Sequence, residues 1–204
     1  MLAPASAAKW TVFAAGVVAL VASTAIGVLA GDLIRRFVPD ERIIKCFGGA
    51  LFSQEDELRL RNCAFRKNRA TNGGGGGVCL QSSVAVIDAC ELYFNRASND
   101  GGGALFNRSG SLLLTNCSFS SNMVEGGSGG AVHNEQSGAV VVNCTFAENS
   151  CISSSGAFYN KSGNSVVANS VFSGNGGGEI SAAGGTITLA RSIVPGWSGA
   201  ANIV

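Results

Sequence analysis

The stretch "GGAVHNEQSGAVVVNCTF", residues 129–146, joins a glycine pair, two short apolar runs and an Asn-Cys-Thr-Phe segment. Each of these pieces recurs along the chain. Equivalent glycines, followed by a small or apolar residue in every copy but one, are Gly49, Gly77, Gly103, Gly130, Gly156 and Gly178. Their spacings of 28, 26, 27, 26 and 22 residues define six copies of one unit, and the quoted stretch is the fourth copy.

Three more columns of residues follow the glycines in the same order in each copy. The first column is Cys63, Cys90, Cys117, Cys144, Ser170 and Ser192. The second is Phe65, Leu92, Phe119, Phe146, Phe172 and Val194. The third is Asn68, Asn95, Asn122, Asn149 and Asn175, and Trp197 then interrupts it. Linked columns of this kind indicate that every copy folds alike and stacks on its neighbours.

Short runs before the cysteine column predict strands. The runs "ELRLRN", "AVIDA", "LLLTN", "VVVN", "VVAN" and "ITLAR" are mostly rich in strand-forming residues and too short for helices. Parallel stacking at about 4.8 Å would turn each column into a ladder. A second inward column is Leu60, Ile87, Leu114, Val141, Val167 and Leu189. Because it lies three residues before the cysteine column, the chain must turn between the two, at Asn62, Asn116, Asn143 and Asn169.

These repeats resemble those of the polymorphic outer-membrane proteins. The segments "GGALFNRSGSLLLTNCSFSSN" and "GGAVHNEQSGAVVVNCTFAEN" carry that family's Gly-Gly-Ala-aliphatic and Phe-x-x-Asn hallmarks, and the likeness covers about residues 46–197. It implies a right-handed parallel β-helix on a cell surface or secreted, often used in adhesion. The chain departs from the family in leaving no room for a C-terminal membrane barrel. The expected fold is therefore all-β, a β-helix of about six coils over residues 46–204, after an N-terminal hydrophobic helix.

The N-terminal segment predicts a passage into or across a membrane. Residues 10–30 carry no charge over 21 positions, which suffices to span a hydrocarbon core of about 30 Å. A membrane anchor and a cleaved signal peptide ending at Ala30 are the main alternatives, and a buried core helix is the third. Small residues at helical spacing, Gly16, Ala19, Ser23 and Gly27, suit a partner transmembrane helix, although such residues are common in these segments. We expect a membrane-anchored or secreted, extracytoplasmic protein with residues 1–45 as anchor or signal segment and linker.

Charge and cysteine content restrict the possible cofactors and partners. Only 13% of the residues are charged and the net charge is +1, so nothing favours nucleic acid. Four cysteines on successive rungs would span about 14 Å, too far for one zinc ion. We therefore expect no metal and no cofactor. The seven cysteines are interpreted as small buried fillers, or as including one or more disulfides among Cys46, Cys79 and Cys151. The asparagine column predicts a ladder of amides bonded from coil to coil.

A row after each glycine pair is the candidate binding surface. The inward column Leu51, Cys79, Leu105, Val132, Phe158 and Ile180 is followed directly by Phe52, Leu80, Phe106, His133 and Tyr159. Alternation predicts that this second row points outward, and we take Phe52, Phe106, His133 and Tyr159 as tentative binding residues. Aromatic side chains suit sugar rings or the apolar edge of a partner protein. The alternative is that a loop or the N-terminal segment covers them. A second outward stripe, Val140, Val142, Val166 and Ala168, is apolar.

The sequence indicates a structural or adhesive protein without an evident catalytic site. Acidic side chains are scattered, and the local groups Glu55 to Glu57 and Asp88 with Glu91 lie at different offsets from their glycines. A polysaccharide-acting β-helix enzyme and an accessory subunit of a membrane assembly remain as alternatives. Four acceptor patterns for N-glycosylation occur, and we expect room for a glycan at Asn107 and Asn160, and none at Asn116 and Asn143.

Overall fold

A computed structural model describes residues 51–153 and 155–196 and the backbone of 201–203. All of these belong to the second of the two units into which the chain divides, Asp40–Val204. The predicted anchor or signal segment at 10–30, the predicted domain boundary after residue 45, and Cys46 lie outside the described residues. Within the described residues, no helix has the length and hydrophobicity needed to span a membrane.

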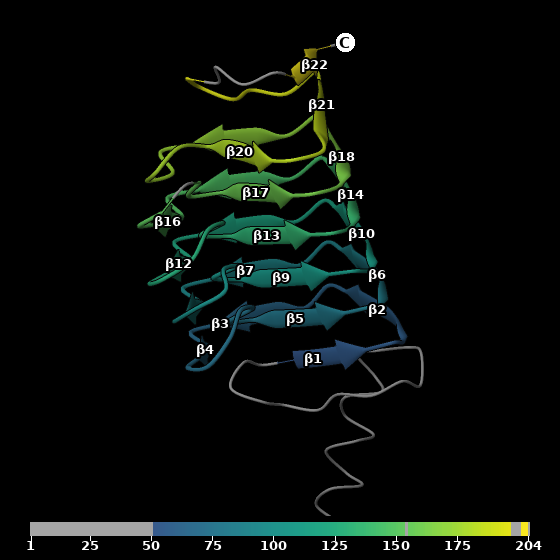
Figure 1. The fold of residues 1–204 in the computed structure, drawn as a ribbon, viewed down its shortest axis with the longest axis vertical. Coiled ribbons are helices and arrows are strands. Elements are labelled where there is room, and N and C mark those ends of the chain that lie inside the picture. The colour runs from purple at the N-terminus through teal and green to yellow at the C-terminus, as the bar shows by residue number, and fades with distance from the viewer. Residues whose placement is uncertain (1–50, 154, 197–200, 204) are drawn as a thin grey trace, which may run out of the picture. The chain divides into compact units, whose positions relative to one another are not determined.

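The described chain winds into a parallel β-helix (Figure 1). Sheet A contains β1 (Leu51–Gln54), β5 (Val78–Gln81), β9 (Leu105–Arg108), β13 (Val132–Glu135), β17 (Phe158–Lys161) and β20 (Ile180–Ala183). Sheet B contains β2 (Glu57–Arg61), β6 (Val84–Asp88), β10 (Ser111–Thr115), β14 (Gly138–Val142), β18 (Asn164–Ala168), β21 (Thr186–Ala190) and β22 (Ala201–Ile203). Sheet C contains β3 (Ala64–Arg66), β7 (Glu91–Tyr93), β11 (Ser118–Ser120), β15 (Thr145–Ala147) and β19 (Val171–Ser173). Sheet D contains β4 (Arg69–Ala70), β8 (Arg96–Ala97), β12 (Met123–Val124) and β16 (Ser150–Cys151).

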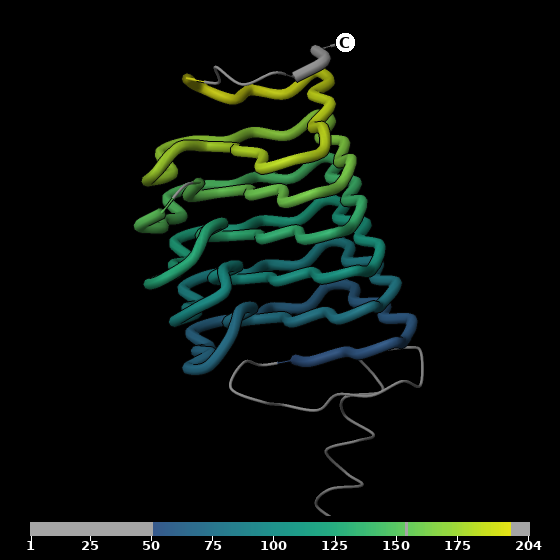
Figure 2. The backbone as a smooth tube through the Cα atoms, in the orientation of Figure 1, coloured from purple at the N-terminus to yellow at the C-terminus, as the bar shows by residue number. Residues whose placement is uncertain are grey.

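The coils stack one above another (Figure 2), and the first four each contribute one strand to the sheets in the order A, B, C, D. Sheets A and B contain six and seven strands, whereas sheets C and D contain five and four. The described part therefore makes about five turns, against the six coils expected from the repeats. All strand pairs are parallel, which confirms the β-helix prediction.

The interior consists of the predicted columns. The apolar column Leu60, Ile87, Leu114, Val141, Val167 and Leu189 is buried throughout, which confirms its inward assignment. Of the next column, Phe65 is half-buried, while Leu92, Phe119, Phe146 and Phe172 are fully buried. The rings of Phe119 and Phe146 lie 4.8 Å apart and nearly parallel, and Phe146 and Phe172 lie 4.6 Å apart. These distances equal the strand spacing of a sheet, so the register itself stacks the rings.

A left-handed residue turns the chain from sheet B to sheet C. At this corner φ lies between 48° and 55° in every coil, and four of the six residues are asparagines: Asn62, Ala89, Asn116, Asn143, Asn169 and Arg191. Asparagine adopts this conformation more readily than other side chains, which explains the asparagines before the cysteine column. Because of this corner, residues three apart both point inward.

The second corner, from sheet C to sheet D, is built on the asparagine ladder. The Asn68 Nδ2 donates to Asn95 Oδ1 at 2.9 Å, and the Asn95 Nδ2 donates to Asn122 Oδ1 at 3.0 Å. The same geometry continues through Asn149 to Asn175. Each of these side-chain oxygens also accepts the backbone N–H of the preceding coil's asparagine, as Asn122 Oδ1 does from Asn95 at 2.9 Å. This is the coil-to-coil bonding that the sequence predicts.

The second glycine of each pair allows neighbouring coils to approach closely. A Cβ on Gly103 would lie 2.2 Å from the Gly130 carbonyl oxygen, and one on Gly130 would lie 2.4 Å from that of Gly156. In the second coil this role belongs to Gly76, whose Cβ would meet the Gly103 oxygen at 2.4 Å. The predicted start at Gly77 is therefore wrong by one residue, because the run of five glycines leaves the repeat register ambiguous.

The corrected register exchanges two side chains between the faces of sheet A. Cys79 pairs with Phe52 and Phe106, whereas Leu80 pairs with Ser53 and Asn107. Leu80 is fully buried in the interior and Cys79 is half-buried. Their predicted places, Cys79 inward and Leu80 outward, are thus reversed.

A second interior ladder was not foreseen. The Asn107 Nδ2 donates to Asn134 Oδ1 at 2.8 Å, and the Asn134 Nδ2 donates to Asn160 Oδ1 at 2.8 Å. All three side chains are fully buried, so Asn107 and Asn160 have no room for a glycan. Asn116 and Asn143 lie at exposed corners instead. The glycosylation prediction is therefore wrong, because an asparagine one position past the outward row points back inside.

Candidate binding surfaces

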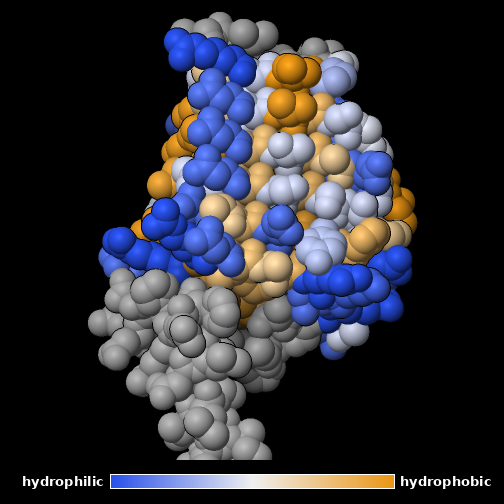
Figure 3. All heavy atoms as spheres, turned by 180° about the vertical axis from the view of Figure 1, so that it is seen from behind, coloured by the Kyte–Doolittle hydropathy of each residue, from blue (hydrophilic) through white to orange (hydrophobic). Residues whose placement is uncertain are grey.

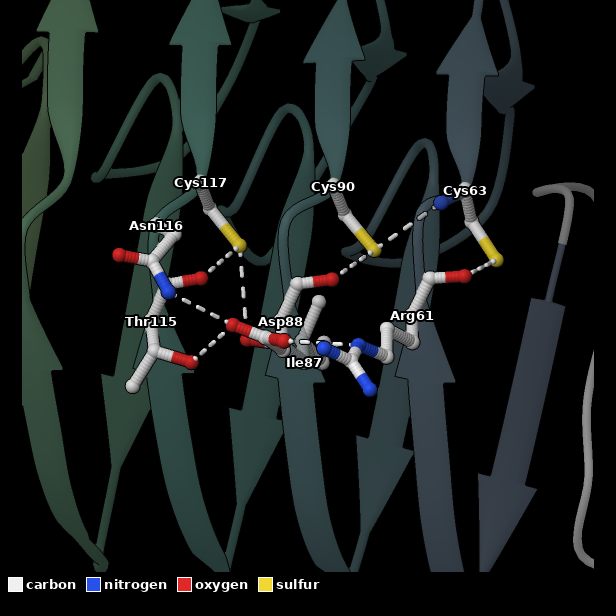
Figure 4. A network of polar contacts seen from close by, with 8 residues as sticks. All are labelled: Arg61, Cys63, Ile87, Asp88, Cys90, Thr115, Asn116 and Cys117. Carbon is white, nitrogen blue, oxygen red and sulfur yellow. Dashed lines mark hydrogen bonds and ion pairs between the residues drawn. The ribbon is translucent and has the colours of Figure 1, made fainter.

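The cysteine column forms a hydrogen-bonded ladder at the corner between sheets B and C (Figure 4). The Cys90 thiol donates to the Asp88 carbonyl at 3.2 Å, and the Cys117 thiol donates to the Thr115 carbonyl at 3.1 Å. The Cys90 sulfur also accepts the Cys63 backbone N–H at 3.4 Å. Ser170 repeats both contacts, since its hydroxyl donates to the Ala168 carbonyl and accepts the Cys144 N–H. Serine can therefore replace cysteine in the last two coils because both side chains bind the same backbone groups.

The buried thiols of this column differ in pKa, since a hydrogen bond with Cys117 lowers the pKa of Cys144 while Cys90 and Cys117 are shifted upward. Cys90, Cys117 and Cys144 are buried and form no disulfide. A hydrogen bond with the Cys144 thiol, together with burial, raises the pKa of Cys117 to about 12. A hydrogen bond with Cys117 and then burial raise the pKa of Cys90 as well. Since the thiolate is the reactive form, both groups are weak nucleophiles at neutral pH. Within the described residues, no three His, Cys, Asp or Glu side chains lie together as metal ligands.

The predicted aromatic row lies on the outer face of sheet A, which faces the viewer in Figure 1. Phe52, Cys79, Phe106, His133 and Tyr159 are in register on adjacent strands. The His133 ring lies edge-on between Phe106 and Tyr159, with centroid distances of 5.0 and 4.9 Å. Edge-to-face contacts of this kind are favourable between rings.

Glycine-rich loops cover the middle of this aromatic row. A Cβ on Gly74 would lie 2.9 Å from Cγ of Phe106, and one on Gly101 would lie 2.1 Å from Nδ1 of His133. Phe106 and His133 are each 5% exposed, whereas Phe52 and Tyr159 are half-buried. The expected outward exposure is therefore wrong for Phe106 and His133. These glycines belong to the loops that connect sheet D to sheet A. Because they lack a Cβ, the loops can pack directly on the rings of Phe106 and His133.

His133 is buried without a hydrogen-bond partner. The backbone of Asp100 approaches the ring, but neither ring nitrogen completes a hydrogen bond. Burial lowers the pKa of His133 to about 4, although the negative charge of Glu135 acts in the opposite direction. The imidazole is therefore neutral at physiological pH, and it packs as an aromatic ring.

A row of charged residues lies beside the aromatic row and is internally neutralised. Glu135 accepts from Lys161 Nζ at 2.8 Å and from Arg108 Nη2 at 3.1 Å, and Arg108 also lies 5.0 Å from the centre of the Phe106 ring. Burial alone would raise the pKa of Glu135, but hydrogen bonds from Lys161 and Arg108 hold it below its ordinary value. The outer face of sheet A thus has its two middle rings, Phe106 and His133, covered and the charges of Arg108, Glu135 and Lys161 paired.

An open groove runs beside the asparagine ladder, where sheet D leaves the body of the coils. Its volume is about 470 Å³. One wall consists of the residues that precede each ladder asparagine, Lys67, Phe94, Ser121 and Glu148, and the other consists of the residues that follow, Arg69, Arg96, Met123 and Ser150. We call this feature the ladder groove. Figure 3 shows the molecule from behind, with a column of hydrophilic side chains along one edge of the coils and further hydrophilic groups near their lower end.

The side chains of the ladder groove are open to solvent. Phe94 is 51% exposed, and Lys67, Arg69 and Arg96 are exposed as well. Arg69 forms an ion pair with Glu125 at 3.2 Å. Within the described part of the chain, Lys67 and Arg96 take part in no ion pair. At the other end, Glu148 accepts a hydrogen bond from the Ser121 hydroxyl at 3.3 Å. The groove therefore changes from basic, through apolar, to acidic along its length.

Sequence reasoning missed this groove. Columns considered one at a time do not show that the residues on either side of an asparagine face each other. The available signal was positional, since Lys67, Arg69 and Arg96 all lie next to a ladder asparagine.

The comparisons with known proteins agree with this architecture. The family model described as "Right handed beta helix region" matches residues 40–194. The chain therefore belongs to the right-handed β-helix family, and the predicted repeat class is confirmed. A comparison with curated proteins finds no match, and a comparison with solved structures finds none.

Proposed function

We propose that this protein is a structural or adhesive β-helix that binds a partner through its lateral surface. The observation that carries the proposal is the ladder groove, which combines the exposed ring of Phe94 with Lys67 and Arg96, two cations that form no ion pair among the described residues. A β-helix is rigid along its axis because each coil bonds to the next over its whole length. Side chains on such a support lose little conformational freedom on binding, which favours affinity.

The acidic side chains support binding more than catalysis. The Asp88 carboxylate accepts from Thr115 Oγ1 at 2.7 Å and Asn116 Nδ2 at 2.8 Å, and it pairs with Arg61 at 3.2 Å (Figure 4). Those hydrogen bonds, the one from Thr115 first, lower its pKa. Glu125 and Glu135 are held in ion pairs too. Carboxylates tied to neighbouring coils serve the stacking of the solenoid, whereas a catalytic acid or base must reach a substrate.

We include membrane attachment and an extracytoplasmic location in this proposal, because residues 10–30 carry no charge. The resemblance to polymorphic outer-membrane proteins points the same way. Fractionation of the source cells, followed by protease treatment of intact cells, tests it. We expect the chain in the membrane fraction or the medium and accessible to the protease. Recovery in the soluble interior of the cell would contradict this part of the proposal.

The binding part is tested with the full chain in mild detergent, immobilised and exposed to candidate surface proteins and to a glycan array. We expect binding that weakens with salt and with the double substitution Lys67→Gln and Arg96→Gln. The matched control is Arg59→Gln, which removes an exposed positive charge on the outer face of β2, away from the groove. Equal loss with Arg59→Gln would show that only overall charge matters.

A second candidate, an accessory subunit of a membrane assembly, is favoured by the outer face of sheet B. Val84, Val140 and Val166 are exposed there, at 52%, 41% and 39%. Such a surface suits a lasting contact with another protein. Purification in mild detergent distinguishes the two functions, since an accessory subunit elutes with a fixed partner in constant ratio.

A further inference from the structure

Phe94 lies in a conformation and an environment that a phenylalanine side chain disfavours. Its φ is 55°, in the left-handed region where a bulky residue is an outlier. Its ring is 51% exposed, and its partner Tyr93 touches it only edge-on at 6.0 Å. Three coils beyond Phe94, the equivalent position before the ladder asparagine is occupied by Gly174, with φ 67°. Lys67, Ser121 and Glu148 adopt the same left-handed conformation in their coils, with φ of 55°, 52° and 56°. The repeated corner therefore sets the backbone, and the exposed aromatic side chain at position 94 is the departure that the fold does not require.

The composition of the ladder groove is that of a protein-binding surface. Phe94 and Met123 lie on opposite walls of adjacent coils, with Arg69 and Arg96 beside them. Aromatic residues, methionine and arginine are the types enriched at the centres of protein interfaces. Methionine adapts to side chains of different shape, which suits an apolar anchor from a partner chain.

The charges of the groove define the polarity of its ligand. Lys67, Arg69 and Arg96 belong to the first two coils, and Glu148 belongs to the fourth. Phe94 shares the second coil with Arg96 on the opposite wall, and Met123 in the third coil lies between Arg96 and Glu148. A complementary segment therefore carries acidic side chains at one end, an apolar side chain in the middle, and a neutral or basic residue at the other end.

On this basis we infer that the ladder groove binds an extended segment of a partner protein with the pattern acidic, apolar, basic, aligned with the solenoid axis. The inference rests on the proposed binding function and names its ligand class. Phe94 supplies the apolar contact, Lys67 and Arg96 bind the carboxylates, and Glu148 excludes a second acidic group.

The test uses three synthetic peptides and the full chain in mild detergent, with binding followed by fluorescence anisotropy. The first peptide has two glutamates, a central leucine and two lysines, separated by serine and glycine. The second replaces the lysines by glutamates, and the third replaces the leucine by serine. We expect the first peptide to bind most tightly, and Glu148→Gln to strengthen binding of the second peptide selectively.

Variants of the groove separate its roles. Lys67→Gln with Arg96→Gln should weaken the first peptide roughly tenfold, and Arg59→Gln should leave it nearly unchanged. Phe94→Gly should weaken it roughly fivefold, the equivalent of about 1 kcal/mol of ring contact, while thermal stability is kept or raised. A loss of stability with Phe94→Gly would show that the ring serves the fold.

Other outcomes overturn the inference. Equal binding of all three peptides, or binding that Phe94→Gly does not affect, would reduce the site to nonspecific charge attraction. Tighter binding of an oligogalacturonate than of the first peptide would assign the groove to an acidic glycan, and the proposed adhesive function would stand. If neither peptides nor glycans nor surface proteins bind, the proposed function falls together with the inference.

Discussion

The outer face of sheet A and the ladder groove both combine aromatic rings with cations, yet they differ in accessibility. On sheet A, glycine loops cover Phe106 and His133, and Glu135 neutralises the neighbouring cations. In the groove, Phe94 is open to solvent. The difference teaches that a stripe of aromatic residues in a repeat protein has two uses. Its rings either pack beneath a loop from another coil, or they remain exposed and available to a binding partner.

The largest expected effect comes from the loop that covers sheet A. In Gly101→Ala the new Cβ would lie 2.1 Å from His133 Nδ1 and 2.3 Å from the Ser128 carbonyl, at a φ of 112°. We expect a loss of about 4 kcal/mol of stability, combining overpacking with backbone strain. Thermal unfolding measures it. Gly176→Ala is the control, since its Cβ meets nothing closer than 3.5 Å. Equal melting temperatures of the two variants would mean that the loop does not rest on His133.

Truncating the rings compares the two surfaces directly. Phe106→Ala removes a buried ring that contacts His133 edge-on, so we expect a cost of about 3 kcal/mol. Phe94→Ala removes an exposed ring, and its cost should stay within about 0.5 kcal/mol. Chemical denaturation of both variants gives the two values. If Phe94→Ala destabilises the protein as much as Phe106→Ala, the two rings do not differ in burial as described.

Acid should weaken the covered face through His133. Its pKa in the folded protein is about 4, below the ordinary value of 6.5, so the unfolded chain binds a proton first as the pH falls. Stability is therefore complete above about pH 7 and declines toward pH 4, by between about 2 and 3 kcal/mol from this group. The charged groups near the ring are those of Glu135, Lys161, Arg108 and Asp100. A variant that replaces only His133 leaves all four in place.

His133→Gln isolates this contribution, because it removes the only histidine of the chain. The difference in unfolding free energy between wild type and variant should shrink as the pH falls from 7 to 4. Parallel pH profiles for the two proteins would show that the imidazole is already solvated in the folded state.

The smallest effect concerns the paired charges. Glu135→Gln leaves Lys161 and Arg108 without their carboxylate partner, and the Glu135 side chain is only 11% exposed. We expect a cost between about 1 and 2 kcal/mol. Lys67→Gln in the groove should cost almost nothing, since it breaks no ion pair in the described part of the chain. A marked loss with Lys67→Gln would reveal a structural partner for that lysine.

The sequence predicted those features that repeat in every coil. The columns of Leu60, Cys63, Phe65 and Asn68 recur at fixed offsets, so each implies a ladder and together they imply a β-helix. The prediction failed where one copy departs from the pattern. The glycine run before Cys79 hides the register, and Asn107 reads as a surface residue unless the strand is placed to the residue.

Contacts between different coils were the other limit. The cover on Phe106 comes from Gly74 in the preceding coil, and the ladder groove joins columns on two sides of a corner. A column shows which residues stack on one another, but not which loop passes over them. The aromatic row was therefore found as a row, and its accessibility was misjudged.

Hydroxyl-radical footprinting of the native full chain, read by mass spectrometry, tests the central difference between the two surfaces in one measurement. The oxidation rates of Phe94 and Phe106 are each normalised to the rates in the denatured chain. We expect Phe94 to be oxidised readily and Phe106 to be strongly protected. If Phe106 is oxidised as readily as Phe94, the glycine loops do not cover sheet A and the account of the two surfaces is wrong.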